Sequence, residues 1–264
     1  MTGPKVVRPR DLREALGLAF VHRGRVNWRA GKSRFLGIDY PGSGDGAVTV
    51  DVGDIADFRD VRADRHGVRI GAFADLTTIA NEPAVREALG IDSFSSDVAR
   101  FRLNALGAQL LIAGMGQTRT APLEESLGVN GSRPLAAGEL PVAVELRAGG
   151  PSVWFGDRRI RRRDGAATFE LRVFVALTFA GFHRIGSAAV AYSLDGGAPV
   201  PLASVEAILR GAMIAKTTFA DAARQAGDAF RGDNVHANTL RRTIVPLVLS
   251  ALKDAYATAR ERKA

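Results

Sequence analysis

The spacing of hydrophobic residues near the start of the chain predicts a small mixed unit of one helix and two strands. Apolar residues recur at helical intervals over 10–22, and Asp11 is suited to cap the N-terminus of this helix. These apolar positions are Leu12, Ala15, Leu16 and Ala19. Residues 25–31 predict a short strand running into a glycine-containing loop, and residues 47–55 predict a second strand. The expected order is helix, strand, loop, strand.

The middle of the chain predicts a strand followed by helices and a second glycine-containing loop. Residues 68–89 begin as a strand, turn at Gly71 and Ala72, and continue with the spacing of one or two helices. Pro83 suits the first turn of such a helix, because the N–H that proline lacks would be unpaired there. Another helix is predicted over 96–107, leading into an apolar passage that contains Gly107.

The last part of the chain predicts a sheet followed by three helices. After a weak pattern from 128 to 170, two long strands are expected within 167–197. The three helical stretches are 204–214, 218–230 and 238–260, and Pro246 interrupts the last of them. This arrangement indicates an antiparallel sheet packed on helices.

Composition narrows the classes of function. The chain has 264 residues, of which 46% are hydrophobic and 24% charged, as in a globular protein. It has no Cys, which excludes disulfides, thiolate catalysis and Cys-ligated metal centres on this chain, and its four His show no metal-ligand spacing. We therefore predict no metal site. No apolar run approaches the roughly 20 residues that cross a bilayer, and the N-terminus lacks the apolar core of a signal peptide. We expect a cytoplasmic protein that does not bind membranes.

The net charge of +8 does not by itself indicate nucleic-acid binding, because Arg is interspersed with Asp and Glu along most of the chain. One exception is the run from Arg158 to Arg163, in which five of six residues are Arg. It indicates a solvated hairpin or strand edge, or a contact surface for an acidic partner. No nucleic-acid recognition motif accompanies it, so we expect no nucleic-acid partner.

The order of the motifs resembles that of a known family. AGKSRFLG (30–37), VTVDVGDIADFRDV (48–61), VRIGAFADLTTIANEPAVREAL (68–89) and ALGAQL (105–110) occur in sequence. They resemble the FAD-binding subunit, or medium chain, of the xanthine dehydrogenase and aerobic carbon monoxide dehydrogenase family, whose motifs read A-G-G-T-D, I-G-A and T-I-G-G-N. The segments 182–211 and 237–252 resemble the C-terminal domain of the same family.

The resemblance implies an α+β fold with a two-part FAD-binding domain followed by a C-terminal domain of antiparallel sheet and helices. The expected division is 1–60, 61–168 and 169–264. The implied function is an oxidoreductase subunit that holds FAD and relays electrons from partner iron–sulfur and molybdopterin subunits to an acceptor. A homo-oligomer is an alternative to such partners.

The cofactor-binding residues implied by the resemblance lie in three segments. They are Ala30, Gly31, Lys32, Ser33 and Arg34 in the first loop, Gly71 and Ala72 at the middle turn, and Gly107, Ala108 and Gln109 in the second loop. A loop of this kind holds phosphate on main-chain N–H groups, and glycine allows the close approach. Both loops depart from the family motifs, and compared with the family the segment between Pro122 and Leu140, which covers the flavin there, is short.

These departures leave two interpretations open. Lys32 and Arg34 replace lost backbone donors by charge-assisted contacts to the diphosphate, or the loops no longer bind flavin. In the second case the fold binds another small molecule and catalyses a non-redox step, a cyclisation or isomerisation, in specialised metabolism. A third hypothesis is an assembly subunit that docks a partner through the arginine run. We assign no catalytic residue, and we expect Trp28, Trp154 and His183 to pack in the core or at an interface.

Overall fold

The computed structural model describes residues 6–22, 25–29, 48–91, 95–114, 117–123, 135–136, 139–150, 152–164, 167–181, 183–229 and 237–261. The chain forms two compact units. The first unit consists of Met1–Ala99 and Leu106–Gly150, and the second of Arg100–Ala105 and Pro151–Ala264. Along the chain, one boundary between the units falls after Gly150, whereas the expected border between residues 168 and 169 falls inside a strand. The three-part division stays a prediction.

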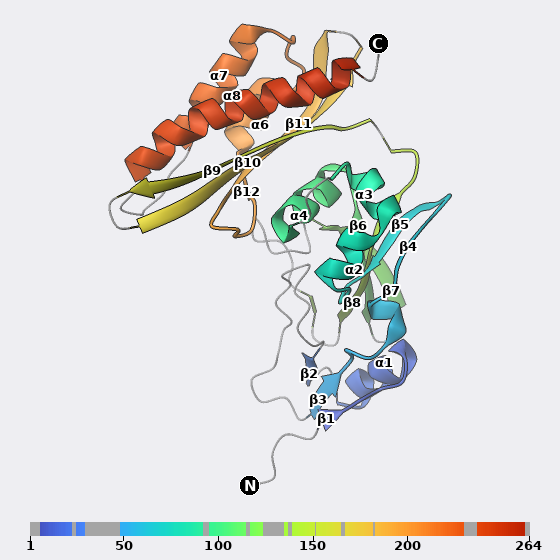
Figure 1. Ribbon diagram of the computed structural model, residues 1–264. Helices are drawn as coiled ribbons and strands as arrows, with labels where there is room; N and C mark the ends of the chain where they lie inside the picture. Colours follow the sequence, from blue (N-terminus) through green and yellow to red (C-terminus); the bar gives the residue numbers. More distant parts are fainter. Residues whose placement is uncertain are drawn as a thin grey trace. The chain divides into compact units, whose positions relative to one another are not determined.

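The first unit begins with a parallel three-stranded sheet, in the order β1-β3-β2 (Figure 1). Its strands are β1 (Val6–Val7), β2 (Val26–Arg29) and β3 (Val48–Asp51), and its helix is α1 (Leu12–Val21). The Asp11 carboxylate caps α1 by accepting a hydrogen bond from the Glu14 N–H at 2.8 Å. The predicted helix and the strands on either side of the first loop are thus confirmed.

A five-stranded antiparallel sheet completes the first unit, in the order β4-β5-β8-β6-β7. Its strands are β4 (Val61–Asp64), β5 (Gly67–Gly71), β6 (Gln109–Gly114), β7 (Gln117–Pro122) and β8 (Leu140–Arg147). The helical elements are η1 (Ala56–Phe58), α2 (Leu76–Asn81), α3 (Pro83–Leu89) and α4 (Ser96–Ala105), which crosses into the second unit. Pro83 is the first residue of α3, as its missing N–H predicts.

One hydrophobic cluster joins the two sheets of the first unit. It contains Val26, Val50, Phe58, Phe73 and Leu140, each at most 3% exposed. Trp28 belongs to the same cluster at 9% exposure, so its predicted packing role is confirmed.

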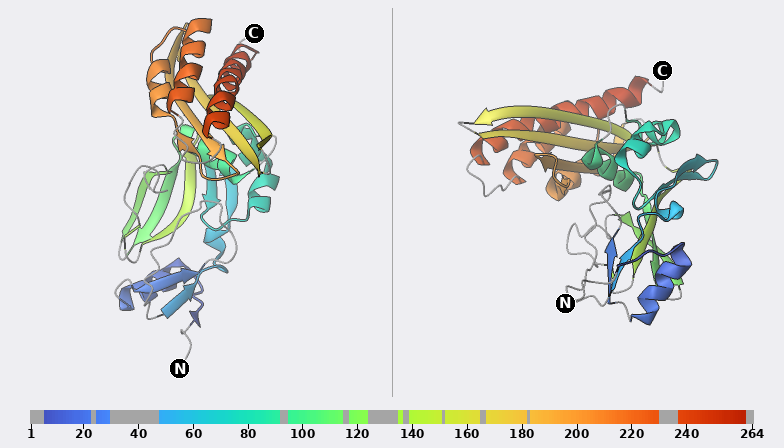
Figure 2. Two further views of the ribbon diagram at one scale, coloured as in Figure 1. Left: turned by 90° about the vertical axis from the view of Figure 1, so that its left-hand side faces the viewer. Right: turned by 60° about the horizontal axis from the view of Figure 1, so that its bottom comes forward.

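The second unit is an antiparallel four-stranded sheet covered by helices on one face (Figures 1 and 2). The strand order is β12 (Val200–Pro201), β11 (Arg184–Leu194), β10 (Ala167–Ala180) and β9 (Trp154–Asp164). The covering helices are α6 (Ala203–Leu209), α7 (Lys216–Ala229) and α8 (Ala237–Glu261), and α8 continues through Pro246. Alternate residues of β10, such as Val173, Val175 and Leu177, are fully buried against them. The predicted α+β fold is confirmed.

The arginine run lies in β9, at the edge of this sheet. This agrees with the predicted strand edge, and charged side chains at such a position oppose pairing with another strand. His183 does not pack in the core: it is exposed at the turn between β10 and β11, where its carbonyl accepts a hydrogen bond from the Ile214 N–H at 2.9 Å. The reason is that the chain reverses at Gly181, with φ 69°, which places His183 at the end of the hairpin and not within a strand.

Candidate cofactor-binding site

The second predicted loop is a tight turn between α4 and β6. Gly107 is exposed and has φ 76°, a left-handed conformation that glycine adopts without steric cost. A Cβ placed on it would meet no heavy atom within 4 Å. The main chain at Gly107 therefore borders open space, which suits the approach of a phosphate to backbone N–H groups.

The two residues after Gly107 shape this turn from the protein side. Ala108 is only 1% exposed, and its carbonyl accepts a hydrogen bond from the Leu123 N–H at 3.1 Å. The methyl group at this position therefore does not obstruct the open side of the turn. Gln109 donates from Nε2 to the Gly107 carbonyl at 3.2 Å, which fixes the conformation of the turn.

Gly71 and Ala72 are held within the protein. The Gly71 N–H donates to the Asp60 carbonyl at 2.7 Å, and the Ala72 N–H donates to the Val142 carbonyl at 2.9 Å. A Cβ on Gly71 would lie 2.4 Å from the carbonyl group of Phe58. Their main-chain donors are thus used by the fold. A structural role accounts for the glycine, and a cofactor role for this pair stays a prediction.

The first loop, Ala30 to Arg34, lies outside the described residues. The structure does describe its flanks, since the chain leaves β2 at Arg29 and returns at β3. Asp51 at the end of β3 lies 3.8 Å from Arg8 Nε and 3.9 Å from Arg29 Nε, and its Oδ1 accepts from the Gly53 N–H at 3.1 Å. The loop thus leaves the carboxyl end of a parallel strand, where ligands commonly bind in parallel sheets.

The register of the five-stranded sheet separates two of the predicted segments. Arg69, Glu145 and Gln109 form one row across β5, β8 and β6, while Gly71 lies in the row of Leu111. Two residues along the strand and two strands across correspond to about 12 Å. The structure therefore does not bring Gly71 next to the Gly107 turn.

An ion pair fixes the end of the segment that the sequence suggests is shortened. Arg119 of β7 donates from Nε and Nη2 to the two carboxylate oxygens of Glu139, at 2.7 and 2.8 Å. The Ala136 N–H also donates to Glu139 Oε2 at 2.8 Å. The hydrogen bonds from Arg119 lower the pKa of Glu139, and the same contact raises the pKa of Arg119. Most of the segment between Pro122 and Leu140, residues 124–134, lies outside the described part of the chain.

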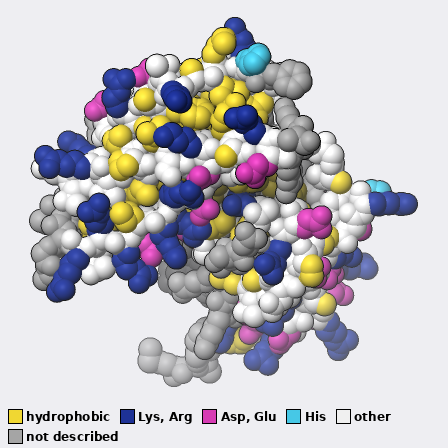
Figure 3. All heavy atoms as spheres, turned by 45° about the horizontal axis from the view of Figure 1, so that its top comes forward, with side chains coloured by type: hydrophobic (Ala, Val, Ile, Leu, Met, Phe, Trp, Pro, Cys, Tyr) yellow, Lys and Arg dark blue, Asp and Glu magenta, His cyan; other side chains and the backbone are white. Residues whose placement is uncertain are grey.

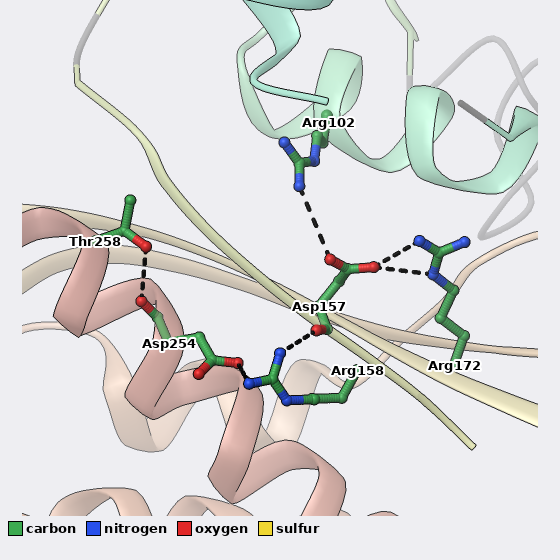
Figure 4. Close-up of polar contacts among 6 residues, drawn as sticks. All are labelled: Arg102, Asp157, Arg158, Arg172, Asp254 and Thr258. Carbon is green, nitrogen blue, oxygen red and sulfur yellow. Dashed lines mark hydrogen bonds and ion pairs between the residues drawn. The ribbon is translucent and has the colours of Figure 1, made fainter. Parts of the chain in front are cut away.

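Sequence reasoning missed a polar cluster on the second unit (Figure 4). Arg172 of β10 donates from Nε to Asp157 Oδ2 at 3.1 Å, and Arg102 of α4 lies 4.0 Å from Oδ1 of the same carboxylate. Arg102, only 9% exposed, also lies over the ring of Phe155 at 4.6 Å. Asp157 and Arg172 lie on the consecutive strands β9 and β10, but Arg102 comes from the distant helix α4, so no local motif indicates the whole cluster.

The neighbouring Arg158 points to the opposite face of β9, toward α8 (Figure 4). It forms an ion pair with Asp254 and donates from Nε to the Ser250 hydroxyl at 3.0 Å. Burial nevertheless raises the pKa of Asp254, because desolvation of the carboxylate outweighs the attraction of Arg158. The first arginine of the run thus joins β9 to α8.

The remaining surface observations concern charge, metals and membranes. Lys and Arg side chains are spread over the face seen in Figure 3, with Asp and Glu among them. Within the described ranges, no group of three or more His, Asp and Glu side chains is arranged to hold a metal ion. None of the described helices is both long enough and apolar enough to span a bilayer.

Comparison with known proteins gives structural likeness along the whole chain. No family model matches the sequence, and no curated protein matches it. A chain of the carbon monoxide dehydrogenase from Hydrogenophaga pseudoflava that lacks the Mo-pyranopterin moiety of the molybdenum cofactor superposes with a TM-score of 0.68 at 17% identity, covering 96% of this chain and 97% of that one.

Two further solved structures agree. A chain of quinoline 2-oxidoreductase from Pseudomonas putida 86 has a TM-score of 0.65 at 18% identity, covering 97% of this chain and 98% of that one. A chain of reconstituted CO dehydrogenase from Oligotropha carboxidovorans gives the same values. The resemblance inferred from the motifs is thereby confirmed at the level of the fold.

Proposed function

We propose that this chain is the flavin-binding subunit of an oxidoreductase of the molybdenum hydroxylase type. The chain holds FAD, and partner subunits with iron–sulfur and molybdopterin centres deliver the electrons. Support comes from the structural likeness to carbon monoxide dehydrogenase and quinoline oxidoreductase chains, which extends over nearly the full length of this chain and of each matched chain. The collinear order of the glycine motifs agrees with it.

One observation carries the cofactor assignment: the open left-handed turn at Gly107. A diphosphate needs main-chain donors that it can approach closely, and Gly107 has no neighbouring atom where a side chain would stand. Ala108 replaces the glycine of the family motif, but its methyl group is buried and leaves that approach free. The residues that the structure describes in this loop therefore fit the diphosphate of FAD.

The residues of the chain bind and orient in this proposal. The turn at Gly107 offers backbone N–H groups to the diphosphate, and Gln109 keeps the turn in shape through its bond to the Gly107 carbonyl. Lys32 and Arg34 of the first loop supply charge-assisted contacts to the same group. When bound, the flavin supplies the electron transfer, and the protein supplies its position and surroundings.

Titration of the purified chain with FAD, followed by absorbance and by quenching of flavin fluorescence, tests the proposal. We expect saturable binding of one FAD. Gly107→Ala should weaken it by about tenfold or more, a loss of about 1.4 kcal/mol. Gly31→Asp should abolish it, because a carboxylate would face the diphosphate.

A matched control separates lost contact from backbone strain. Gly211 is also exposed, has φ 71° and has open space where a Cβ would stand, but it lies in the second unit after α6. Gly211→Ala should leave the dissociation constant of FAD unchanged. Equal weakening in both variants, or a chain that stays colourless after reconstitution with FAD, would reject the flavin subunit and favour the flavin-free, non-redox alternative.

A further inference from the structure

A hollow of about 660 Å³ lies on the first unit, beside the turn of the β4–β5 hairpin and the end of β8. Its lining is made by two short segments that pair in the sheet, 62–69 and 145–148. The charged residues of this lining are Arg62, Arg65, Arg69, Arg147, Asp64 and Glu145. Four arginines thus face two carboxylates. The Gly107 turn is not part of the lining.

The carboxylates do not neutralise the arginines. Glu145 pairs with Arg69, and Asp60, just outside the hollow, lies 3.0 Å from Arg62 Nε. Asp64 accepts a hydrogen bond from the His66 N–H at 2.7 Å, which shapes the turn. Arg65 donates from Nε to the His66 ring at 3.0 Å. Among the residues that the structure describes, no carboxylate lies within ion-pair distance of Arg65 or Arg147, so the hollow carries an excess of positive charge.

A buried donor without an acceptor points in the same direction. The Nε atom of Arg69 is buried and has no hydrogen-bond partner among the described atoms. Such a group costs about 1–3 kcal/mol when it is left unpaired. Arg69 also lines the hollow, so an anion bound there would lie beside an arginine whose hydrogen-bonding capacity is not fully used.

The floor of the hollow is fixed by its backbone. Gly67 has φ 139°, and a Cβ on it would lie 1.9 Å from the Leu146 carbonyl oxygen. The Ala148 N–H donates to the His66 carbonyl at 2.8 Å, which holds the hairpin turn against β8. The backbone from which the arginines extend is therefore fixed, and binding does not have to order the main chain there.

We infer that this hollow binds a phosphorylated small metabolite of about the size of a nucleoside monophosphate, at a site separate from the flavin. Its volume lies in the range of small-molecule pockets. Arginine forks bind phosphate oxygens in pairs, and Arg65 and Arg147 have no carboxylate within ion-pair distance among the described residues, so their guanidinium groups are available to a phosphate. This site is independent of the proposed flavin function.

Isothermal titration calorimetry of the full chain with AMP, inorganic phosphate and adenosine tests the inference. We expect AMP and phosphate to bind and adenosine not to bind. Arg147→Gln and Arg69→Gln should each weaken AMP binding by about tenfold or more. Arg13→Gln is the control, because Arg13 is exposed on α1 away from the hollow, and it should leave AMP binding unchanged.

Two further measurements complete the experiment: a check that each variant is folded, and an AMP titration in the presence of FAD. Circular dichroism checks each variant, and if Arg69→Gln unfolds the protein, the exposed Arg147 decides the outcome. FAD added at saturation should leave the AMP affinity unchanged. The inference fails if AMP does not bind at millimolar concentration, if adenosine binds equally, if all three variants behave alike, or if FAD displaces AMP.

Discussion

Replacing Gly71 by Ala tests whether this glycine serves the fold or a ligand. The new Cβ would lie 2.4 Å from the carbonyl carbon and oxygen of Phe58 and 2.8 Å from the amide nitrogen of Arg59. Carbon atoms in contact normally stay about 3.5–4.0 Å apart, so η1 must withdraw from β5 by about 1 Å. This movement disturbs the two hydrogen bonds that join the segments, Gly71 N–H to the Asp60 carbonyl at 2.7 Å and Phe73 N–H to the Phe58 carbonyl at 2.8 Å.

The magnitude follows from these two effects. Overpacking of this kind costs about 1–3 kcal/mol, and each weakened hydrogen bond costs about 0.5–1.5 kcal/mol. The free energy of unfolding should therefore fall by about 2–6 kcal/mol. For a chain of this length that lowers the melting temperature by at least about 4 °C.

Thermal unfolding of the flavin-free protein, followed by circular dichroism, measures this loss. Gly107→Ala serves as the comparison, because its Cβ enters open space and only the left-handed backbone is strained, at about 1–2 kcal/mol. If Gly71→Ala keeps the parent melting temperature and yet loses FAD binding, Gly71 contacts the cofactor and the structural account is wrong.

Three further predictions concern ion pairs and close packing. Glu139→Gln should destabilise the protein at neutral pH, because Arg119 lowers the pKa of Glu139 in the folded state. In urea unfolding, the difference in free energy of unfolding between variant and parent should vanish as pH falls through that lowered pKa. Because its pKa is raised, Asp254 keeps its proton to a higher pH in the folded state than in the unfolded state. The free energy of unfolding of the parent should therefore fall as pH rises from about 3.8 through the pKa of Asp254 in the folded protein. Asp254→Asn should remove this slope from the melting temperature measured across that window; an unchanged slope contradicts the assignment. Gly156→Ala should lower the melting temperature by several degrees, because its Cβ would lie 2.0 Å from the Ala251 carbonyl oxygen of α8; no change would show that β9 and α8 separate freely.

Much of the fold could be predicted from local pattern. The helix α1 with its Asp11 cap, the proline that begins α3 and the long strands β10 and β11 all follow from spacing and single-residue preferences. Strand β4 was missed, because its four residues, VRAD, form a short segment whose two apolar residues are only partly buried, and it forms through pairing with β5. Pairing partners are set by contacts across the sheet, which a single segment does not encode.

The candidate sites differ in the same way. Gly107 could be singled out from sequence because a glycine between a helix and a strand marks a turn. The arginine hollow could not, since Arg69 and Arg147 lie far apart in the chain and meet only because β5 pairs with β8. Its one local signal is the cluster of Arg62, Arg65 and Arg69 around a His-Gly turn.

The sequence by itself determined the element types, the place of the glycine turns and the absence of cysteine chemistry, because these depend on local geometry and composition. Only the tertiary structure decided what Gly71 and Ala108 do. Both are small residues in similar motifs. Gly71 leaves room for the backbone of η1, whereas the methyl group of Ala108 is buried in the core. Whether the space beside a small residue is open to solvent or filled by protein depends on the neighbours that folding brings to it, and those neighbours are distant in the chain.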